Sequence, residues 1–400
     1  MYKKVKHMTF RDEIKSELVK HIIPFWKGLR DDLYGGYYGM VDYYLNVDKT
    51  APKSCILNSR ILWFFSSSCV ELKDRSLLPY ATHAYEFLME HCLDTKHGGV
   101  YWMLRHDGTP VNMDKHIYAQ AFALYALSAY YLASQDEEAL KQAQCLYDLI
   151  EEKAADEFGY LEAFDSEFVL SSNEELSENG VMAARTMNTL LHVLEAYAGL
   201  YEANPTPKLE DSMRRILNIF QTRVYNPEQR RLDVFFDKNM NSILDIQSYG
   251  HDIEASWLLD WAAGLLGDEK VTGEISNLCS NLVDSVYLNS FKGSCVWNER
   301  INGRDDKTRV WWVQAEAMVG FTNEAHKHPH EDRYLLASRH IWDYIKSYLI
   351  DKRPGSEWFW KLNEAEKPFD EKPIVEPWKC PYHNGRMCLE ILRRTGGKMA

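Results

Sequence analysis

The feature that most constrains the fold of this chain is a short glycine- and aromatic-rich stretch that recurs six times. Each copy is typical of a short strand or hairpin, with alternating residue character beside turn-forming residues. The copies begin at residues 35, 98, 159, 231, 293 and 355, so their spacings are 63, 61, 72, 62 and 62 residues. Such a regular interval indicates a repeat architecture built from six units.

Each unit also contains two helical patterns of different character. One is amphipathic, which is typical of a helix at the outside of a protein. The other is apolar almost all round and must be buried on most sides. The amphipathic helices are predicted at residues 13–29, 78–92, 137–152, 208–224, 274–288 and 334–350. The apolar helices are predicted at residues 55–72, 118–133, 182–201, 251–266, 310–321 and 384–392.

A ring of six inner and six outer helices, an (α/α)6 barrel, suits both kinds of helix. The apolar helices are buried in the inner ring, and the amphipathic helices cover them with their polar faces in water. An open superhelical solenoid would leave one face of the apolar helices in water, so we favour the closed barrel. No linker rich in proline, glycine or serine interrupts the pattern. We therefore predict an all-α fold with short β-hairpins in the connecting loops, and a single catalytic domain over residues 1–400.

The composition narrows the choice of partner. The formal net charge of −13 argues against nucleic acid and against anionic membrane surfaces. Aromatic residues make up 13% of the chain, and aromatic rings stack well on the apolar faces of sugars. No apolar run approaches the roughly 18 residues of a membrane span, and no signal-peptide pattern is present. We expect a cytoplasmic monomer with reduced cysteines that binds a small molecule.

The predicted ring also gathers polar groups at one end. Its inner helices run in the same direction, so their unpaired N–H groups and positive dipole ends meet at one rim. Such a rim suits oxygen-rich ligands and developing negative charge. An unusual polar or aromatic residue lies near the predicted start of each inner helix, at Arg60, Tyr118, Asn188, His251, Trp312 and His383. We predict that this one structural position, used six times, forms a site.

Neighbouring residues at helical spacing strengthen this prediction. The pairs that share a helix face are Asn188 with His192, Trp312 with Glu316, and His251 with Glu254. Any one such pair is also typical of a hydrogen-bonded core histidine, and it is the repetition that favours a site. Arg60 interrupts an apolar run and needs a partner if it is buried; an ion pair with an acidic neighbour is the structural alternative. His383 follows a turn between Pro377 and Pro381, where a histidine is more often functional than structural.

Three longer motifs carry a resemblance to a known family. Residues 248–257 read SYGHDIEASW, residues 309–317 read RVWWVQAEA, and residues 378–387 read WKCPYHNGRM. Together with residues 59–65 and 187–192, they resemble the N-acylglucosamine 2-epimerase family, and within it the enzymes that act on disaccharides. The resemblance covers essentially the whole chain. It implies an (α/α)6 barrel, no cofactor, and reversible epimerisation at C2 of the reducing-end glucose of β-1,4-linked disaccharides such as cellobiose and lactose.

The resemblance also implies the site residues. The family's functional residues are present at Arg60, His192, His251, Glu254, Trp257, Trp312, Glu316, Trp378 and His383. Tyr118 and Asn188 correspond to further positions that contact the sugar. One departure is Asn58, where some relatives have histidine. This change leaves the chemistry intact and is expected to alter the rim around Arg60.

The implied reaction assigns roles to these residues. Epimerisation at C2 needs an open-chain aldehyde, removal of the C2 proton, and return of a proton to the other face. Histidine suits both proton transfers because its ordinary pKa, about 6.5, lies near the working pH. We assign His251 and His383 as the two bases. Arg60, with Asn188 and His192, is expected to stabilise the negative cis-enediolate intermediate.

The remaining candidates have supporting roles. Glu254 and Glu316 are expected to orient the two imidazoles, as the acid of a catalytic triad orients its histidine. Trp312 and Trp378 are expected to stack on the sugar rings, with Trp257 as a further contact. No metal is assigned.

Four alternatives stay open at this level. An inverting glycoside hydrolase would use Glu254 and Glu316 about 6.5–9.5 Å apart. A metal-dependent isomerase would use His192, His251 and His383, although no local ligand spacing supports it. A non-catalytic sugar-binding module would have no use for two histidines at the rim. A monosaccharide 2-epimerase or an aldose–ketose isomerase of the same family would share the enediolate step.

Overall fold

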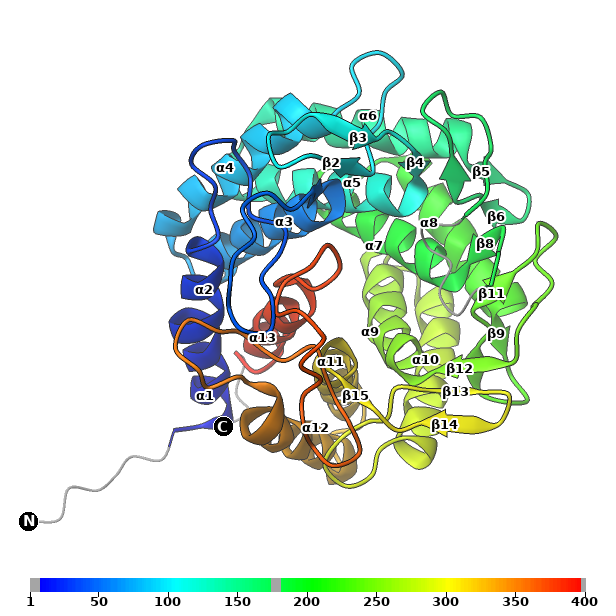
Figure 1. The fold of residues 1–400 in the computed structure, drawn as a ribbon. Helices are drawn as coiled ribbons and strands as arrows, with labels where there is room; N and C mark the ends of the chain where they lie inside the picture. Colours follow the sequence, from blue (N-terminus) through cyan, green and yellow to red (C-terminus); the bar gives the residue numbers. More distant parts are fainter. Residues whose placement is uncertain (1–7, 174–180, 397–400) are drawn as a thin grey trace, which may run out of the picture.

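The structure is a computed structural model that describes residues 8–173 and 181–396, and its helices form two concentric rings (Figure 1). The inner ring consists of α3 (Cys55–Glu71), α5 (Ile117–Ser134), α7 (Met187–Ala203), α9 (Tyr249–Leu265), α11 (Trp311–Lys327) and α13 (Tyr382–Arg394). The outer ring consists of α1 (Phe10–Glu17) with η1 (Leu18–Ile22) and α2 (Ile23–Lys27), α4 (Leu78–Phe87) with η3 (Leu88–Cys92), α6 (Glu137–Lys153), α8 (Pro207–Ile219) with η5 (Phe220–Val224), α10 (Glu269–Asn289), and α12 (Asp332–Tyr344) with η6 (Ile345–Leu349). The predicted (α/α)6 barrel is confirmed.

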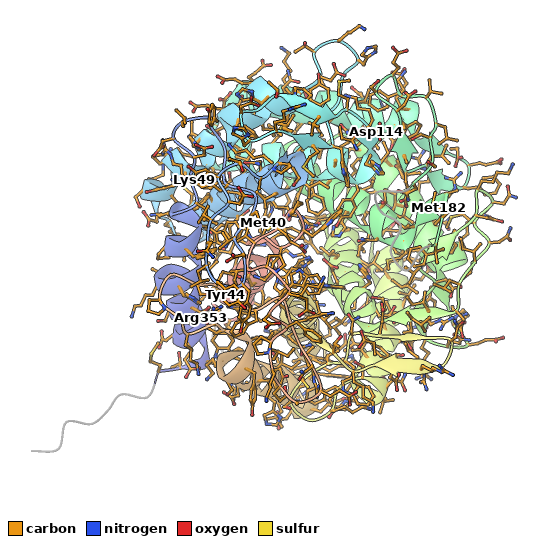
Figure 2. All side chains as sticks on the ribbon, viewed as in Figure 1. Met40, Tyr44, Lys49, Asp114, Met182 and Arg353 are labelled. Carbon is orange, nitrogen blue, oxygen red and sulfur yellow. The ribbon has the colours of Figure 1, made fainter. Side chains whose placement is uncertain are left out.

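The ring is closed. Each inner helix packs against the next one, and α13 packs back against α3. On the strand-bearing face, the Val41 N–H of the first unit donates to the Val375 carbonyl of the last unit at 3.1 Å. The guanidinium of Arg353 also lies 4.6 Å from the ring centroid of Tyr43. Figure 2 shows Arg353 beside Tyr44, the next residue in the chain. The first and last units therefore meet, and an open solenoid is excluded.

A short antiparallel pairing follows every outer helix, as the repeated stretches predicted. Its form varies from isolated bridges to two-residue strands. The pairings are Arg30 with Tyr37, Leu93 with Val100, β5 (Ala155–Asp156) with β6 (Gly159–Tyr160), β9 (Tyr225–Asn226) with β10 (Arg231–Leu232), Phe291 with Val296, and Ile350 with Trp358.

A second set of pairings joins neighbouring units. The strand that enters an inner helix pairs antiparallel with a strand of the next unit, as in the register Lys53↔Leu104. The pairs are β1 (Lys53–Ser54) with β2 (Met103–Leu104), β4 (Lys115–His116) with β7 (Ala163–Phe164), β8 (Arg185–Thr186) with β11 (Phe235–Phe236), β12 (Ile246–Ser248) with β13 (Glu299–Ile301), and β15 (Arg309–Val310) with β16 (Lys361–Leu362). Strand β3 (Pro110–Asn112) extends the first sheet and β14 (Arg304–Asp306) the fourth. The start of each of these inner helices is thus fixed to an adjacent unit.

A polar residue at the fourth position of an inner helix fastens it to the hairpin of its own unit. In α3, the side-chain oxygen of Asn58 accepts from the Tyr37 N–H at 3.0 Å, and its amide donates to the Ser54 carbonyl at 3.2 Å. The same contact to a hairpin N–H recurs from Gln120 to Val100, from Asp252 to Leu232, and from Gln314 to Val296. Asn58 therefore holds α3 to the hairpin of its own unit. The expected change in the rim around Arg60 stays a prediction.

The predicted helix over residues 182–201 begins too early. Residues 185–186 form β8, and α7 starts at Met187 because the Thr186 hydroxyl accepts from the Thr189 N–H at 3.1 Å. The apolar pattern did not reveal this cap. All eight cysteines are free, and seven of them are buried, as expected for reduced thiols. No helix of the described residues is both long enough and apolar enough to cross a membrane.

Candidate active site

The predicted rim residues lie in two layers on the inner helices. The upper layer is formed by the second or third residue of a helix, at Tyr118, Asn188, His251, Trp312 and His383. A deeper layer is formed by the sixth residue of a helix, at Arg60, His192, Glu254 and Glu316. The prediction of one position used six times is therefore wrong for Arg60. Helix α3 begins at Cys55, where the Ser54 hydroxyl caps it, so Arg60 lies a turn further in.

The two histidines assigned as bases pack against the same indole. The ring centroid of His251 lies 4.8 Å from that of Trp312, and the ring centroid of His383 lies 5.4 Å from it. Each ring is anchored at Nδ1, His251 by the Ser248 hydroxyl at 2.8 Å and His383 by the Glu316 carboxylate at 2.7 Å. Among the described residues, neither Nε2 atom has a hydrogen-bond partner. Both rings therefore keep one nitrogen available for a ligand.

Beside His251 and Trp312 lies a cavity of about 330 Å³. Its walls include His251, Trp312 and Trp360, together with polar groups of Asn298 and Asp306. A cavity with aromatic walls and a few convergent polar groups is the usual form of a small-molecule site. Of the predicted residues, His251 and Trp312 line this pocket, His383 contacts its Trp312 wall, and Trp378 lines a separate cavity.

Burial controls the charge of both imidazoles. It lowers the pKa of His251 to about 3 and lowers the pKa of His383 well below its ordinary value. For His383, the positive charges of Arg386 and Arg60 act in the same direction. Both rings are therefore neutral near pH 7, the form in which an imidazole accepts a proton.

Arg60 lies beneath the upper layer and is only 2% exposed. It donates from Nη2 to the Tyr118 hydroxyl at 2.7 Å and from Nη1 to the Trp378 carbonyl at 3.2 Å. The rings of Phe122 and Tyr382 pack on its guanidinium at 4.1 and 4.8 Å. Among the described residues it forms no ion pair, so the structural alternative of a carboxylate partner is wrong. A buried cation without a counterion is suited to meet an anionic ligand or intermediate.

A second buried arginine organises the deeper layer. Arg386, which is 1% exposed, donates to the carboxylates of Glu195 and Glu254 and, at 2.8 Å, to Glu316. The hydroxyl of Tyr382 also donates to Glu195. Prediction from sequence missed Arg386, Glu195 and Tyr382. Two of them carried a detectable signal, because Arg386 follows His383 by three residues and Glu195 follows His192 by three.

The three carboxyl groups around Arg386 differ in their protonation. Burial raises the pKa of Glu254, and the negative charge of Glu316 adds to the effect. Burial also raises the pKa of Glu316, against the attraction of Arg386. For Glu195 the attraction of Arg386, together with the hydrogen bond from His192, outweighs burial and holds the pKa at about 2. Glu195 is therefore the firmly charged partner of the arginine.

Glu254 and Glu316 were expected to orient the imidazoles of the two histidines, and only Glu316 does so. Glu316 holds His383, as described above. Glu254 bonds to Arg386 and lies 3.9 Å from Nδ1 of His383, while His251 is held by Ser248. His192 is held by Glu195 at 2.8 Å. Glu254 thus supports the arginine rather than orienting His251.

One group of side chains has the spacing that a metal site requires. It consists of Glu254, Glu316 and His383, whose possible metal-ligand atoms lie within 4.8 Å of one another. This group differs from the three-histidine set of the metal-dependent alternative. Nη2 of Arg386 donates to both carboxylates, so a guanidinium already supplies the positive charge at this point. The donor set therefore fits an arginine-centred network better than a metal centre.

The aromatic candidates occupy different levels. Trp378 lies at the rim, with its ring centroid 5.7 Å from that of Trp102 and 6.0 Å from that of Tyr118. Trp102 was not predicted, and with Trp378 it lines a small cavity of about 110 Å³. Trp257 lies deeper than the carboxylates, and its Nε1 donates to Glu316 at 3.0 Å. Its placement differs from the expected sugar contact, because it supports Glu316 from the side away from the rim.

We expect the free energy of unfolding to decrease as the pH falls from about 6.5 toward 3. The folded-state pKa of His251 lies below its unfolded value, so the unfolded chain binds a proton that the folded chain excludes. The loss begins near the unfolded pKa and ends near the folded one. Urea unfolding at pH 7.5, 6.5 and 5.5 measures it. His251→Asn should reduce the slope of unfolding free energy against pH by at most about 1.4 kcal/mol per pH unit. His340→Asn, at an exposed position, is the control and should keep the wild-type slope. Equal slopes in the wild-type protein and both variants would contradict the expectation.

The closed double ring and the buried imidazole, carboxylate and guanidinium groups at one end define this protein as an (α/α)6-barrel enzyme. The chain belongs to the N-acylglucosamine 2-epimerase family, whose sequence model matches residues 35–384.

Individual relatives agree over nearly the full length. The chain is 48% identical over 382 residues to a protein of Ruminococcus albus named cellobiose 2-epimerase, covering 96% of this chain and 98% of the relative. The solved structure of a sugar epimerase from a ruminal bacterium has a TM-score of 0.95 at 47% identity, covering 97% and 99% of the two chains. That of cellobiose 2-epimerase from Bacillus thermoamylovorans has a TM-score of 0.93 at 44% identity, covering 96% and 99%.

Proposed function

We propose that this protein is a cofactor-independent 2-epimerase that interconverts glucose and mannose at the reducing end of β-1,4-linked disaccharides such as cellobiose and lactose. One observation carries the proposal: two neutral imidazoles flank one indole, and each has its Nδ1 anchored and its Nε2 free. Similarity to enzymes named cellobiose 2-epimerase supports the choice of substrate.

The reaction proceeds by exchange of the C2 proton. After the reducing-end ring opens to the aldehyde, one imidazole Nε2 takes the proton from C2. The electron pair of the broken C2–H bond forms the C1=C2 double bond, and O1 receives the negative charge as a cis-enediolate. Because both rings are neutral at rest, the second imidazole must first take up a proton from solvent, and it then returns this proton to the opposite face of C2. His251 and His383 fill these two roles, and no redox change occurs.

The enediolate needs a preformed positive environment. Arg60 supplies a buried guanidinium, and its Nε has no hydrogen-bond partner among the described residues. The side-chain oxygen of Asn188 is also buried and unpaired, so this amide is available to a sugar hydroxyl. His192 adds an imidazole fixed by Glu195. These groups stabilise charge that develops only during the reaction, which is how such donors raise kcat.

The geometry gives less support to a glycoside hydrolase. An inverting mechanism needs two carboxyl groups separated by about 6.5–9.5 Å, with room for a water molecule between them. Glu254 and Glu316 are fully buried, bond to the same arginine, and have ligand-type oxygens within 4.8 Å of each other. Neither carboxyl group is free to protonate a glycosidic oxygen.

The proposed reaction is tested by incubating the protein with cellobiose in D₂O and following the products by NMR. We expect a disaccharide with mannose at its reducing end that carries deuterium at C2, because the second base returns a proton that comes from solvent and not the one that was abstracted. Free glucose would indicate hydrolysis, and a 2-keto product alone would indicate an aldose–ketose isomerase. A manno product without deuterium at C2, under conditions where the base exchanges its proton, would contradict the two-base route.

Replacing Arg60 should separate binding from turnover. We expect Arg60→Met to lower kcat about 10²–10³-fold, with a much smaller change in KM, because the guanidinium acts on charge that forms after binding. Steady-state kinetics with cellobiose measure both constants. Arg339→Met, on the exposed face of α12, is the control and should leave both unchanged. A rise in KM at constant kcat would assign Arg60 to ground-state binding instead.

A further inference from the structure

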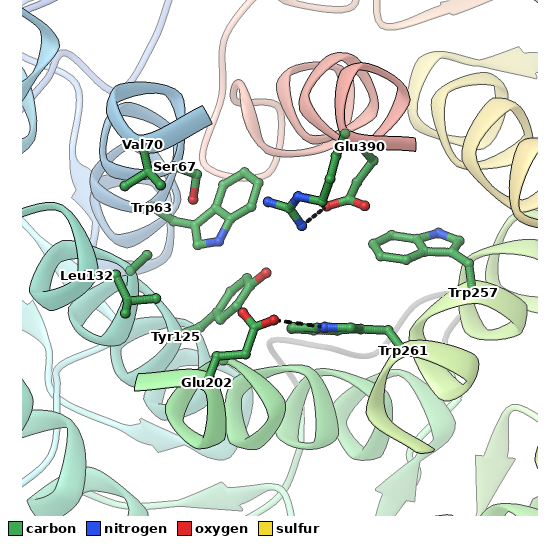
Figure 3. A pocket seen from close by; sticks show the side chains of 12 residues that line it. Trp63, Ser67, Val70, Tyr125, Leu132, Glu202, Trp257, Trp261 and Glu390 are labelled. Atoms are coloured by element: carbon green, nitrogen blue, oxygen red, sulfur yellow. Dashed lines mark hydrogen bonds and ion pairs between the residues drawn. The ribbon is translucent and has the colours of Figure 1, made fainter. Parts of the chain in front are cut away.

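A second cavity lies at the other end of the barrel, where the inner helices end (Figure 3). Its volume is about 240 Å³, and it is bordered by the second halves of α3, α5, α7, α9 and α13. Four aromatic side chains surround it, from Trp63, Tyr125, Trp257 and Trp261. We propose that this cavity binds one neutral saccharide ring and that its occupancy alters turnover at the rim.

Two hydrogen-bond donors open onto the cavity from side chains that are otherwise buried. Trp63 is 5% exposed and Tyr125 is 8% exposed, and their rings stack with centroids 5.5 Å apart. Among the described residues, neither Nε1 of Trp63 nor the hydroxyl of Tyr125 has a hydrogen-bond partner, and Figure 3 shows the Tyr125 hydroxyl directed into the cavity. Both groups can therefore donate to a ligand that offers oxygen acceptors.

The position of Tyr125 is built into the neighbouring helix. A Cβ atom at Gly199 would lie 2.6 Å from the Tyr125 ring, so only glycine allows the ring to rest against α7 at this point. The close approach keeps the phenol turned toward the cavity. Together with its stacking on Trp63, it makes Tyr125 a fixed wall rather than a loose side chain.

Acceptor groups complete the lining. Glu202 accepts from Nε1 of Trp261 at 3.3 Å, and Glu390 accepts from Arg393 at 2.8 Å. Both carboxylates keep further acceptor capacity. The cavity therefore combines flat aromatic faces, unpaired donors and available acceptors, which are the groups that a sugar ring requires.

Other ligand classes fit less well. An anion would meet two carboxylates and the negative ends of the inner helices. A cation would be attracted by those carboxylates and helix ends, but it would meet the guanidinium of Arg393 and would offer no acceptor to the N–H of Trp63. An apolar molecule would leave the donors of Trp63 and Tyr125 unpaired. A sugar hydroxyl both donates and accepts, and the volume lies below the roughly 300–1,000 Å³ typical of drug-sized ligands, which favours a single ring.

Trp257 links this cavity to the site at the rim. Its ring forms part of the cavity wall, and its Nε1 donates to the same Glu316 carboxylate that holds His383. A ligand that shifts the indole changes this hydrogen bond and hence the position of the imidazole. This step rests on the proposed epimerase activity, whereas binding of the sugar does not.

The binding test uses the intact protein and methyl β-D-glucopyranoside, a probe that cannot open to an aldehyde. Affinity is measured by calorimetry and by saturation-transfer NMR. Trp261→Ala and Glu202→Ala should each weaken binding at the lower cavity at least about tenfold, while Trp312→Ala, at the rim, should leave that binding unchanged. Binding lost only in Trp312→Ala would overturn the proposal, as would no binding of the glucoside or a preference for tetramethylammonium.

The coupling test measures kcat at saturating cellobiose with and without the glucoside. In the wild-type protein we expect kcat to change about fivefold, and in Glu202→Ala, which leaves the rim intact, we expect no change. Glucoside binding without any effect on kcat would overturn the coupling and leave the binding site. If neither the wild-type protein nor any variant turns over cellobiose while the glucoside still binds, the result would contradict the proposed epimerase activity. It would leave the proposed sugar site in the lower cavity unaffected.

Discussion

Replacing either His251 or His383 by alanine is expected to lower epimerisation of cellobiose by about 10²–10⁴-fold. Each ring has a free Nε2 beside the Trp312 indole, and the reaction needs one group to remove the proton and another to return it. His340→Ala, on the exposed face of α12, is the matched control and should retain full activity. Retention of more than about a tenth of the activity by either variant would contradict the assignment.

Hydrogen exchange gives a sharper form of the same test. A variant that lacks one base can still remove the C2 proton of the epimer that faces the other base. We therefore expect His251→Ala and His383→Ala to exchange C2 of opposite epimers with D₂O, although neither completes the inversion. NMR of cellobiose and of the corresponding manno disaccharide, incubated separately, measures this. Exchange of the same epimer by both variants would mean that the two rings act from one side.

Replacing Arg386 by methionine is expected to lower the free energy of unfolding by about 3–5 kcal/mol. The guanidinium is the shared partner of Glu195, Glu254 and Glu316, and its loss leaves buried carboxyl groups without a counterion. Arg386→Lys keeps the charge but cannot reach all three, so it should lose less. Urea unfolding measures both, with the exposed Arg339→Met as the control.

The pH dependence separates this explanation from a simple loss of packing. The uncompensated carboxyl groups of Arg386→Met can accept protons, which removes the buried charge. We therefore expect the difference from wild type to be smaller at pH 5.5 than at pH 8. A difference that is independent of pH would show that the cost arises from the lost volume of the side chain and not from its charge.

The fold was predictable because its signals are local and repeated. Alternating hairpin stretches and two kinds of helix recur at a regular interval, and only a closed double ring suits both kinds. The boundary near residues 182–186 was not predictable from hydrophobicity, because the Thr186 cap and the β8 pairing decide it. The prediction of a single domain over the whole chain stays a prediction.

The sequence predicted which residues form the site better than it predicted the hydrogen bonds between them. Helical spacing placed His251, Trp312 and His383 near one another, but it could not show that Ser248 rather than Glu254 would hold His251. Arg386 was missed because its partners come from α7, α9 and α11 and lie 70 or more residues away in the sequence. Hydrogen bonds between such distant segments leave no periodic signal in the chain.

The bridge between Val41 and Val375 has a consequence for how the protein unfolds. In an open repeat array the terminal repeats fray first, and stability grows as units are added. Here the first and last units cover each other, so no unit is terminal and losing one exposes its two neighbours together. We therefore anticipate a single cooperative melting transition, with amide protons in α3 and α13 exchanging with solvent as slowly as those in α7 and α9.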